Sequence, residues 1–429
     1  MAELKDLASF KEEIEKCVKC GACRAYCPVF SAEPREGRVA RGKVTLAKAI
    51  LQGEVPLQGK VLEELSQCLL CGSCHVQCPN KVPTEEIVAA ARRHIAEQNG
   101  LSTFGKTVSV VLGSQKIMDT LMRTGGRMTH FLFKKVPKDS GLRLRFPGSV
   151  IFPDRTLPAL SAIPFRERVP ERVQGERGKP TVIFFTGCGI NYLFPEIGEA
   201  MLKILHFLGV TVIIPKEQVC CGFPAVSAGA KNTVEALAEQ NFSTLKKYSA
   251  DYIVTACASC HAGLTRIYSD MGGEFKAIAD KTEDICAFLM KNGLLEKLAP
   301  FAQAKNFQAK EKINVTYHDP CHLRNSGITR EPRAILKTLS RVNYIEMAEA
   351  GTCCGLGGTY SVYHYDTSKK IGAKKAGHIA NSGADWVATD CPGCIMQLND
   401  SLNHAGLPQK SVHILELIAR EIYEHSESL

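Results

Sequence analysis

Nineteen cysteines are the residues of this 429-residue chain whose type and spacing could do chemistry. Eight of them form two copies of the pattern C-x2-C-x2-C-x3-C-P, at positions 17–28 and 68–79. Three thiolates spaced in this way can wrap one face of an iron–sulfur cubane, while the fourth, which is followed by proline, reaches a partner cluster. The two copies therefore predict two cubane [4Fe–4S] clusters.

The same spacing predicts that each motif supplies one ligand to the cluster of the other. The first cluster is expected on Cys17, Cys20, Cys23 and Cys78. The second cluster is expected on Cys68, Cys71, Cys74 and Cys27. Crossed ligation would hold the clusters close together, which suits electron hopping. A pair of zinc knuckles is the alternative, although zinc sites usually separate two C-x-x-C pairs by many residues.

Ten further cysteines form an internal repeat. The first copy contains Cys188, Cys220, Cys221, Cys257 and Cys260. The second copy contains Cys321, Cys353, Cys354, Cys391 and Cys394. The first cysteine precedes a Cys-Cys-Gly triplet by 32 positions in both copies, and such matching over two blocks indicates duplication. Each copy predicts a further metal site, at which Gly222 or Gly355 frees the backbone to approach the metal. The alternative is that one copy is a relic that holds zinc or nothing.

The elements that must position these cysteines alternate between strands and helices. Strands are expected at 181–186, 210–214, 252–255, 313–317, 342–345 and 386–389. Helices are expected near 194–208, 228–248, 334–339 and 367–381. This alternation favours parallel βαβ units. Each repeated cysteine group follows a strand, so the groups would converge at the carboxyl edge of a sheet, where open α/β sheets bind their ligands.

The N-terminal part of the chain is expected to be helical. Helices are predicted at 4–16, 42–51 and 61–67, and a fourth is predicted to begin at an N-cap Thr84 and to end at Gly100. Residues 101–135 resemble an amphipathic helix that packs against its own domain, or else faces a partner or a membrane surface. Residues 136–180 are rich in Pro, Gly and Arg and read as an extended connector.

These patterns predict an α+β multidomain protein. A helical ferredoxin-type domain with two clusters is expected over 1–100, and a helical segment with an extended linker over 101–180. Two tandem α/β Cys-Cys-Gly domains with parallel sheets are expected over 181–305 and 306–429.

Composition excludes a disordered or fibrous chain, since 45% of the residues are hydrophobic and 23% are charged. The net charge of +9 does not by itself indicate nucleic acid, because each [4Fe–4S] cluster with its four thiolates carries about −2. A zinc-dependent nucleic-acid module is an alternative, but clustered basic and aromatic residues are lacking. No secretory signal and no apolar run of ~18–20 residues is seen, so we expect a cytoplasmic protein with metal-bound cysteines and no transmembrane segment.

Other candidate residues carry weaker signals. His318, Asp319 and His322 flank Cys321, and His261 follows Cys260, so they could relay protons or tune a cluster. Packing histidines explain the pattern equally well. The lone Cys286 is expected to be a small buried apolar residue. A P-loop and a strand-borne G-x-G-x-x-G are both missing from the sequence, so neither a flavin site nor an NAD site is expected, and no catalytic residue is assigned.

Two ferredoxin motifs followed by two Cys-Cys-Gly blocks resemble the iron–sulfur subunits of glycolate oxidase and D-lactate dehydrogenase. The turn Arg41-Gly42-Lys43, the phrase His-Asp-Pro-Cys-His around Cys321 and Cys-Pro-Gly-Cys at Cys391 are similar to this branch. The resemblance implies an electron-transfer subunit of a flavin-linked 2-hydroxy-acid dehydrogenase. Its partners would be an FAD-binding subunit and a quinone or another electron carrier, with no nucleic acid. They could hold the chain at the inner face of a membrane.

The blocks also resemble parts of heterodisulfide reductase. In those relatives each complete set of five cysteines holds a noncubane [4Fe–4S] cluster at which a disulfide is cleaved. This chain keeps all five cysteines in both sets, so the resemblance implies one or two noncubane clusters beside the two cubanes. It also leaves disulfide reduction open as an alternative function.

Overall fold

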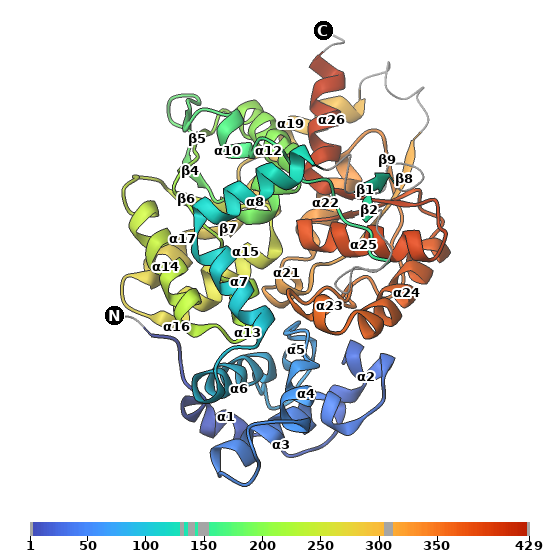
Figure 1. Cartoon of the computed structure of the whole chain (residues 1–429). Coiled ribbons are helices and arrows are strands. Elements are labelled where there is room, and N and C mark those ends of the chain that lie inside the picture. Colours follow the sequence, from blue (N-terminus) through green and yellow to red (C-terminus); the bar gives the residue numbers. More distant parts are fainter. Residues whose placement is uncertain (1–2, 129–132, 136–141, 145–153, 304–311, 427–429) are drawn as a thin grey trace.

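The computed structural model describes residues 3–128, 133–135, 142–144, 154–303 and 312–426. A helical N-terminal unit lies below two α/β units in Figure 1, with the first α/β unit in green and yellow and the second in orange and red. Cysteines of all three units lie where the units meet.

The N-terminal unit is built on helices α3 (Ala40–Leu51) and α6 (Thr84–Asn99), which pack on each other through small and branched apolar side chains. Val44, Ala47, Ile87 and Val88 are all buried between them. The helices of this unit are α1 (Lys11–Glu15), α2 (Pro28–Ala32), α3 (Ala40–Leu51), α4 (Lys60–Ser66), α5 (Ser73–Val76) and α6 (Thr84–Asn99). The short helices α2 and α5 each begin inside a cysteine motif and so direct its loop toward α3 and α6.

Two local predictions for this unit are wrong. Thr84 is already helical and Pro83 is the N-cap, because the chain enters α6 one residue earlier than the side-chain pattern predicts. The segment Arg41-Gly42-Lys43 lies inside α3 and is not a turn. A Cβ on Gly42 would lie 2.1 Å from the carbonyl oxygen of Glu36, so glycine is required there for the preceding backbone to pack against the helix.

Glu86, in the first turn of α6, gives the stability of this unit a pH dependence. Burial, helped by Glu85 and by Asp270 of α16 (Tyr268–Met271), raises the pKa of Glu86 to about 7. A carboxyl with a raised folded-state pKa loses stability as pH rises from its unfolded value toward the folded value. We expect Glu86→Gln to stabilise the protein by about 2 kcal/mol at pH 8 and hardly at all at pH 4.5. Urea unfolding at both pH values measures this.

The control for that experiment is Glu12→Gln, because Glu12 is exposed on α1. Its effect should be small and the same at both pH values. If Glu86→Gln stabilised the protein equally at pH 4.5 and pH 8, the assigned ionisation would be wrong.

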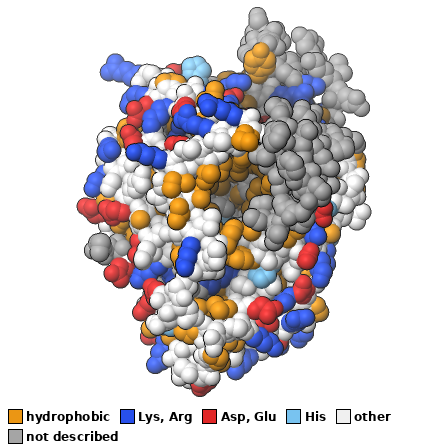
Figure 2. All heavy atoms as spheres, viewed as in Figure 1, with side chains coloured by type: hydrophobic (Ala, Val, Ile, Leu, Met, Phe, Trp, Pro, Cys, Tyr) orange, Lys and Arg blue, Asp and Glu red, His pale blue; other side chains and the backbone are white. Residues whose placement is uncertain are grey.

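Two helices, α7 (Thr103–Gly113) and α8 (Gln115–Arg127), occupy the segment predicted as one amphipathic helix. The hydroxyl of Ser114 accepts a hydrogen bond from the backbone N–H of Ile117 and so starts α8. Helix α7 packs on α13 (Phe223–Ala228) and α14 (Lys231–Leu245) of the first α/β unit. Apolar side chains gather along α7 and α8 in Figure 2, where Val110, Ile117 and Leu121 are exposed.

The first α/β unit contains a five-stranded sheet in the order β3-β5-β4-β6-β7. Its strands are β3 (Arg172–Val173), β4 (Thr181–Phe184), β5 (Thr211–Ile213), β6 (Tyr252–Thr255) and β7 (Thr282–Asp284). All neighbouring strands are parallel except the edge strand β3, which is antiparallel to β5. Strand β3 falls in the predicted connector 136–180, of which 136–141 and 145–153 lie outside the described residues. Helix α12 (Pro195–Phe207) follows β4 as predicted.

The second α/β unit repeats this design with a four-stranded, fully parallel sheet in the order β11-β10-β8-β9. Its strands are β8 (Ile313–Tyr317), β9 (Val342–Tyr344), β10 (Trp386–Thr389) and β11 (Lys410–His413). Its helices include α21 (Cys321–Asn325), α22 (Arg330–Thr338), α23 (Tyr360–Tyr363), α24 (Tyr365–Asn381) and α25 (Pro392–His404). The predicted fold class is confirmed: a helical cluster-binding unit precedes two α/β units with mainly parallel sheets.

A shared apolar core joins the two α/β units. The C-terminal helix α26 (Ile414–Ser426) of the second unit packs on α12 of the first, and Ile197, Ile204 and Ile418 are fully buried there. The imidazole Nε2 of His413 lies 3.1 Å from the carbonyl oxygen of Ala256, across the boundary. These contacts set the cysteine-bearing edges of the two sheets against each other. Among the described residues, we find no helix with the length and apolarity that a bilayer span requires.

Candidate iron–sulfur centres

The first centre is a small cavity beside α3. Five cysteines line it, namely Cys17, Cys20, Cys23, Cys74 and Cys78, and they include the four expected from crossed ligation. Gly21 adopts a φ of +87°, which lets the loop turn between Cys20 and Cys23. The side chain of Arg41 also lines this cavity, and Cys20 is exposed to solvent.

The second centre is a small cavity lined by Cys27, Cys68, Cys71 and Cys74. Cys27 starts α2, where its sulfur accepts a hydrogen bond from the N–H of Phe30 at 3.5 Å. Burial raises the pKa of Cys27 to about 11, so a bound metal is needed to hold this thiol as a thiolate. Cys74 also lines the first cavity, so the two cavities share a wall.

Two cations, the buried Lys43 and the partly buried Arg92, lie next to the second cavity. Lys43 lines the cavity and donates a hydrogen bond to the carbonyl oxygen of Arg38. Burial lowers the pKa of Lys43, while the sulfurs of Cys68 and Cys27 oppose that effect. The guanidinium of Arg92 donates to the carbonyl oxygen of Cys68 at 2.7 Å. Positive charges at this place would stabilise an anionic cluster. Sequence reasoning missed Arg92, because no local motif marks it and only the packing of α6 brings it there.

The first set of five repeated cysteines lies at three strand ends. Cys188 is in α11 (Gly187–Tyr192) after β4, the Cys220–Cys221 pair follows β5, and Cys257 and Cys260 flank the start of α15 (Ala258–Ala262) after β6. The sulfurs of Cys188 and Cys220 are 3.9 Å apart. A Cβ on Gly187 would lie 2.5 Å from the sulfur of Cys260, so glycine keeps these two strand ends close.

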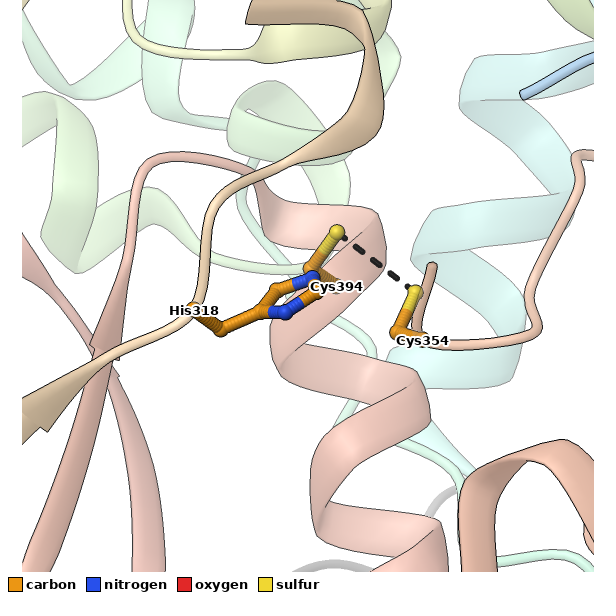
Figure 3. A group of neighbouring side chains, drawn as sticks. All are labelled: His318, Cys354 and Cys394. Atoms are coloured by element: carbon orange, nitrogen blue, oxygen red, sulfur yellow. Dashed lines mark hydrogen bonds between the residues drawn. The ribbon is translucent and has the colours of Figure 1, made fainter. Parts of the chain in front are cut away.

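The second set has the same arrangement. Cys321 follows β8, the Cys353–Cys354 pair follows β9, and Cys391 and Cys394 lie at the start of α25 after β10. The sulfurs of Cys354 and Cys394 are 3.6 Å apart, and Figure 3 shows the ring of His318 beside them. Four of these five cysteines are buried, and Cys321 is partly exposed.

The two sets face each other at Cys257 and Cys391. The neighbouring Cys257 thiol, ahead of any other group, lowers the pKa of Cys391. The hydroxyl of Ser259 lies 4.0 Å from the Cys391 sulfur, and the N–H of Ala258 donates to the carbonyl oxygen of Asp390 at 3.2 Å. The two sets therefore form one continuous group of thiols.

The second set also adjoins the second cavity of the N-terminal unit. The Cys353 thiol, more than burial, raises the pKa of Cys71, so these two sulfurs are neighbours. The side chain of Asn325 donates to the carbonyl oxygen of Cys71 at 2.8 Å, and Arg324 donates to the hydroxyl of Ser73 at 2.8 Å. The second set thus lies between the N-terminal unit and the first set, which is the reverse of their order along the chain.

Neutral histidines surround the repeated sets. Burial lowers the pKa of His318 to about 3 and the pKa values of His261 and His322 to about 4. Each ring has at least one buried nitrogen without a hydrogen-bond partner among the described residues. The buried hydroxyl of Tyr268, beside the first set, also lacks a hydrogen-bond partner among the described residues. Unpaired donors around clustered thiols fit an iron–sulfur group, whose sulfurs accept hydrogen bonds.

Two other residues singled out in the sequence, Asp319 and Cys286, have structural surroundings of a different kind from those of the histidines. The carboxylate of Asp319 is held by the guanidinium of Arg333 at 2.6 and 2.9 Å, which indicates a structural ion pair. Cys286 is fully buried in the apolar core, next to the carboxylates of Asp284 and Asp390. Asp390 also pairs with His413 at 3.1 Å.

Comparison with known proteins agrees with this organisation. A model for a 4Fe-4S dicluster domain matches residues 13–82, and a model for a cysteine-rich domain matches residues 182–265 and 315–399. An uncharacterized iron–sulfur protein of Methanococcus maripaludis is 30% identical over 402 residues, which cover 93% of this chain and 69% of that protein. The Bacillus subtilis protein named "Probable glycolate oxidase iron-sulfur subunit" is 29% identical, and the match covers 97% of each chain.

A third relative carries a different name. It is a subunit of the dihydromethanophenazine:CoB–CoM heterodisulfide reductase of Methanosarcina barkeri, and it is 26% identical over 435 residues, which cover 96% of this chain and 94% of that protein. Both kinds of relative thus align along nearly the whole length of this chain. The chain belongs to the family of iron–sulfur electron-transfer subunits in which a 4Fe–4S dicluster domain precedes two cysteine-rich Cys-Cys-Gly domains.

Proposed function

We propose that this chain is the electron-transfer subunit of a flavin-linked dehydrogenase that acts on a 2-hydroxy acid such as glycolate or D-lactate. An FAD-binding partner would oxidise the substrate, and a quinone or another carrier would receive the electrons. The observation that carries the proposal is the continuous series of four cysteine sets, joined by Cys74, by Cys71 with Cys353, and by Cys391 with Cys257. The whole-length similarity to a glycolate oxidase subunit supports the choice of substrate class.

In this proposal the clusters supply one-electron carriers, and the chain determines the order in which they are used. The order in space is the first cavity, the second cavity, the second repeated set and then the first repeated set. Exposed Cys20 marks the surface end of the series, so a redox partner can approach there. The cations Arg41 and Lys43 lie near the first and second cavity respectively and would stabilise reduced, more negative clusters.

Disulfide reduction is the second candidate. It is favoured because two complete sets of five cysteines lie next to each other. Cleavage of a disulfide consumes two electrons and two protons, breaks one S–S bond and releases two thiols. Two one-electron sites that meet at Cys257 and Cys391 would suit such a step. The similarity to a heterodisulfide reductase subunit agrees with this candidate.

Metal analysis and EPR of anaerobically purified protein test the proposal. We expect about sixteen irons with matching sulfide and no zinc, because all four sets are complete. About eight irons with only cubane signals would contradict a role of the repeated sets in electron transfer. Zinc in place of iron would contradict the whole proposal.

A second measurement separates the two candidates. With the flavoprotein partner and a 2-hydroxy acid present, the dehydrogenase proposal expects reduction of the clusters and no effect of an added disulfide on their EPR signals. If a disulfide or thiol altered the signals, and the hydroxy acid with its flavoprotein reduced nothing, disulfide reduction would replace the first proposal.

A further inference from the structure

The two repeated sets have cysteines at equivalent positions, but they differ in a residue near those cysteines. Three positions before its first cysteine, the first block has Phe185 and the second block has His318. Both residues follow the equivalent central strand of their sheets, β4 and β8, and both are fully buried. The duplication therefore provides a matched pair that differs in the presence of an N–H donor.

The ring of His318 is aimed at the second set. One of its nitrogens and the sulfurs of Cys354 and Cys394 all lie within 4.8 Å of one another. Figure 3 shows the ring, at the end of β8, beside the first turn of α25. Neither ring nitrogen has a hydrogen-bond partner among the described residues. Leaving a buried donor unpaired costs about 1–3 kcal/mol, so an acceptor is expected at this place.

A second difference between the blocks places a basic side chain near the second set. Asn241 and Lys375 lie equally far before the closing C-x-x-C of their blocks. The side-chain oxygen of Asn241 accepts a hydrogen bond from the N–H of Val219 at 2.8 Å, and its side-chain nitrogen donates one to the carbonyl oxygen of Cys220 at 3.0 Å. Lys375 donates to the carbonyl oxygen of Ala350 at 3.2 Å and so braces the matching loop near Cys354 and Cys353. The second set thus has His318 and Lys375 at two positions where the first set has Phe185 and Asn241.

We propose that His318 donates an N–H···S hydrogen bond to the iron–sulfur group of the second set and thereby raises the reduction potential of that group. The inference rests on the proposed function, because it requires a cluster in the second set. Hydrogen bonds to cluster sulfurs and nearby positive charge both stabilise the more negative, reduced state. His318 is a positioning and tuning residue here, and Phe185 leaves the first set without this donor.

The test compares His318→Phe, which copies the first block, with His318→Gln, which keeps an N–H. EPR-monitored redox titration follows the transition of the second set, identified as the one that is lost in Cys353→Ala. We expect His318→Phe to lower that midpoint potential by an amount equal to about a tenfold change in the one-electron equilibrium, or ~59 mV. The transition of the first set should stay unchanged, and His318→Gln should recover most of the shift.

A spectroscopic readout checks the contact directly. Pulsed EPR of protein labelled with 15N-histidine should show a nitrogen coupling to the second-set cluster that disappears in His318→Phe. The reciprocal Phe185→His should raise the potential of the first set and create a coupling there. Iron content is measured in every variant, so that loss of a cluster is not mistaken for a shift.

The failures of the two proposals are distinguishable. If wild-type protein holds no cluster in the second set, the proposed function fails. If the cluster is present but its potential and nitrogen coupling are the same in wild type and His318→Phe, the inference about His318 is overturned and the proposed function stands. Equal shifts in His318→Phe and His318→Gln would likewise overturn it, because they would indicate packing and not an N–H donor.

Discussion

Replacing Cys27 by alanine is expected to destroy the cluster held by the second motif, although Cys27 belongs to the first motif. The physical reason is that Cys27 starts α2 and points into the cavity of Cys68, Cys71 and Cys74, whereas Cys78 completes the other cavity. A cubane that loses one of its four thiolates no longer has a complete ligand set. We expect a loss of about four irons in Cys27→Ala.

The measurement is a comparison of EPR spectra in pairs of variants. Cys27→Ala should give the same residual spectrum as Cys71→Ala, and Cys78→Ala the same spectrum as Cys23→Ala. Cys286→Ala is the control, because Cys286 lines neither cavity, and its iron content should equal that of the wild type. A match between Cys27→Ala and Cys23→Ala would show that each motif binds its own cluster.

Gly72→Ala is expected to separate the dicluster domain from the second cysteine-rich domain. Gly72 has a φ of +66°, and an added Cβ would lie 2.2 Å from the side-chain nitrogen of Asn325. That nitrogen donates to the carbonyl oxygen of Cys71, at the place where Cys71 meets Cys353. The substitution should therefore lengthen the path between the second cavity and the second set, and slow electron transfer between them several-fold.

Gly53→Ala is the matched control for this experiment. Gly53 has a φ of +68° and open space around its Cα, so the variant has only the cost of a left-handed backbone, about 1–2 kcal/mol. The free energy of unfolding should fall by about 1–3 kcal/mol more in Gly72→Ala than in Gly53→Ala. Freeze-quench EPR measures the rate at which electrons reach the second set, and this rate should be unchanged in Gly53→Ala.

A double variant identifies the clash as the cause. Adding Asn325→Ala to Gly72→Ala removes the atom that the new Cβ would meet, so part of the lost stability should return. If Gly72→Ala and Gly53→Ala had equal stabilities and equal rates, the contact at Asn325 would have no part in joining the domains.

Much of the fold could be read from the sequence because its determinants are local. Runs of β-branched residues predict β4, β6, β8 and β10, and the intervening helices follow from apolar periodicity. The strands β3, β7 and β11 are not predicted from the sequence, since they contain no run of β-branched residues and form at sheet edges by pairing with a neighbour. The N-cap of α6 also depends on packing that no local pattern records, whereas the helical state of Gly42 agrees with the helix predicted over 42–51.

The sequence by itself determined the family of the chain and the division of its cysteines into sets, because those depend on spacing within short loops and on the duplication. Tertiary structure alone decided which sets are neighbours. It placed the second repeated set between the dicluster domain and the first set. It also brought Arg92 to the carbonyl oxygen of Cys68, and His318 to the sulfurs of Cys354 and Cys394. The reason is physical: spacing along a chain determines the geometry of one turn, whereas contact between sets depends on how helices and sheets far apart in sequence pack together.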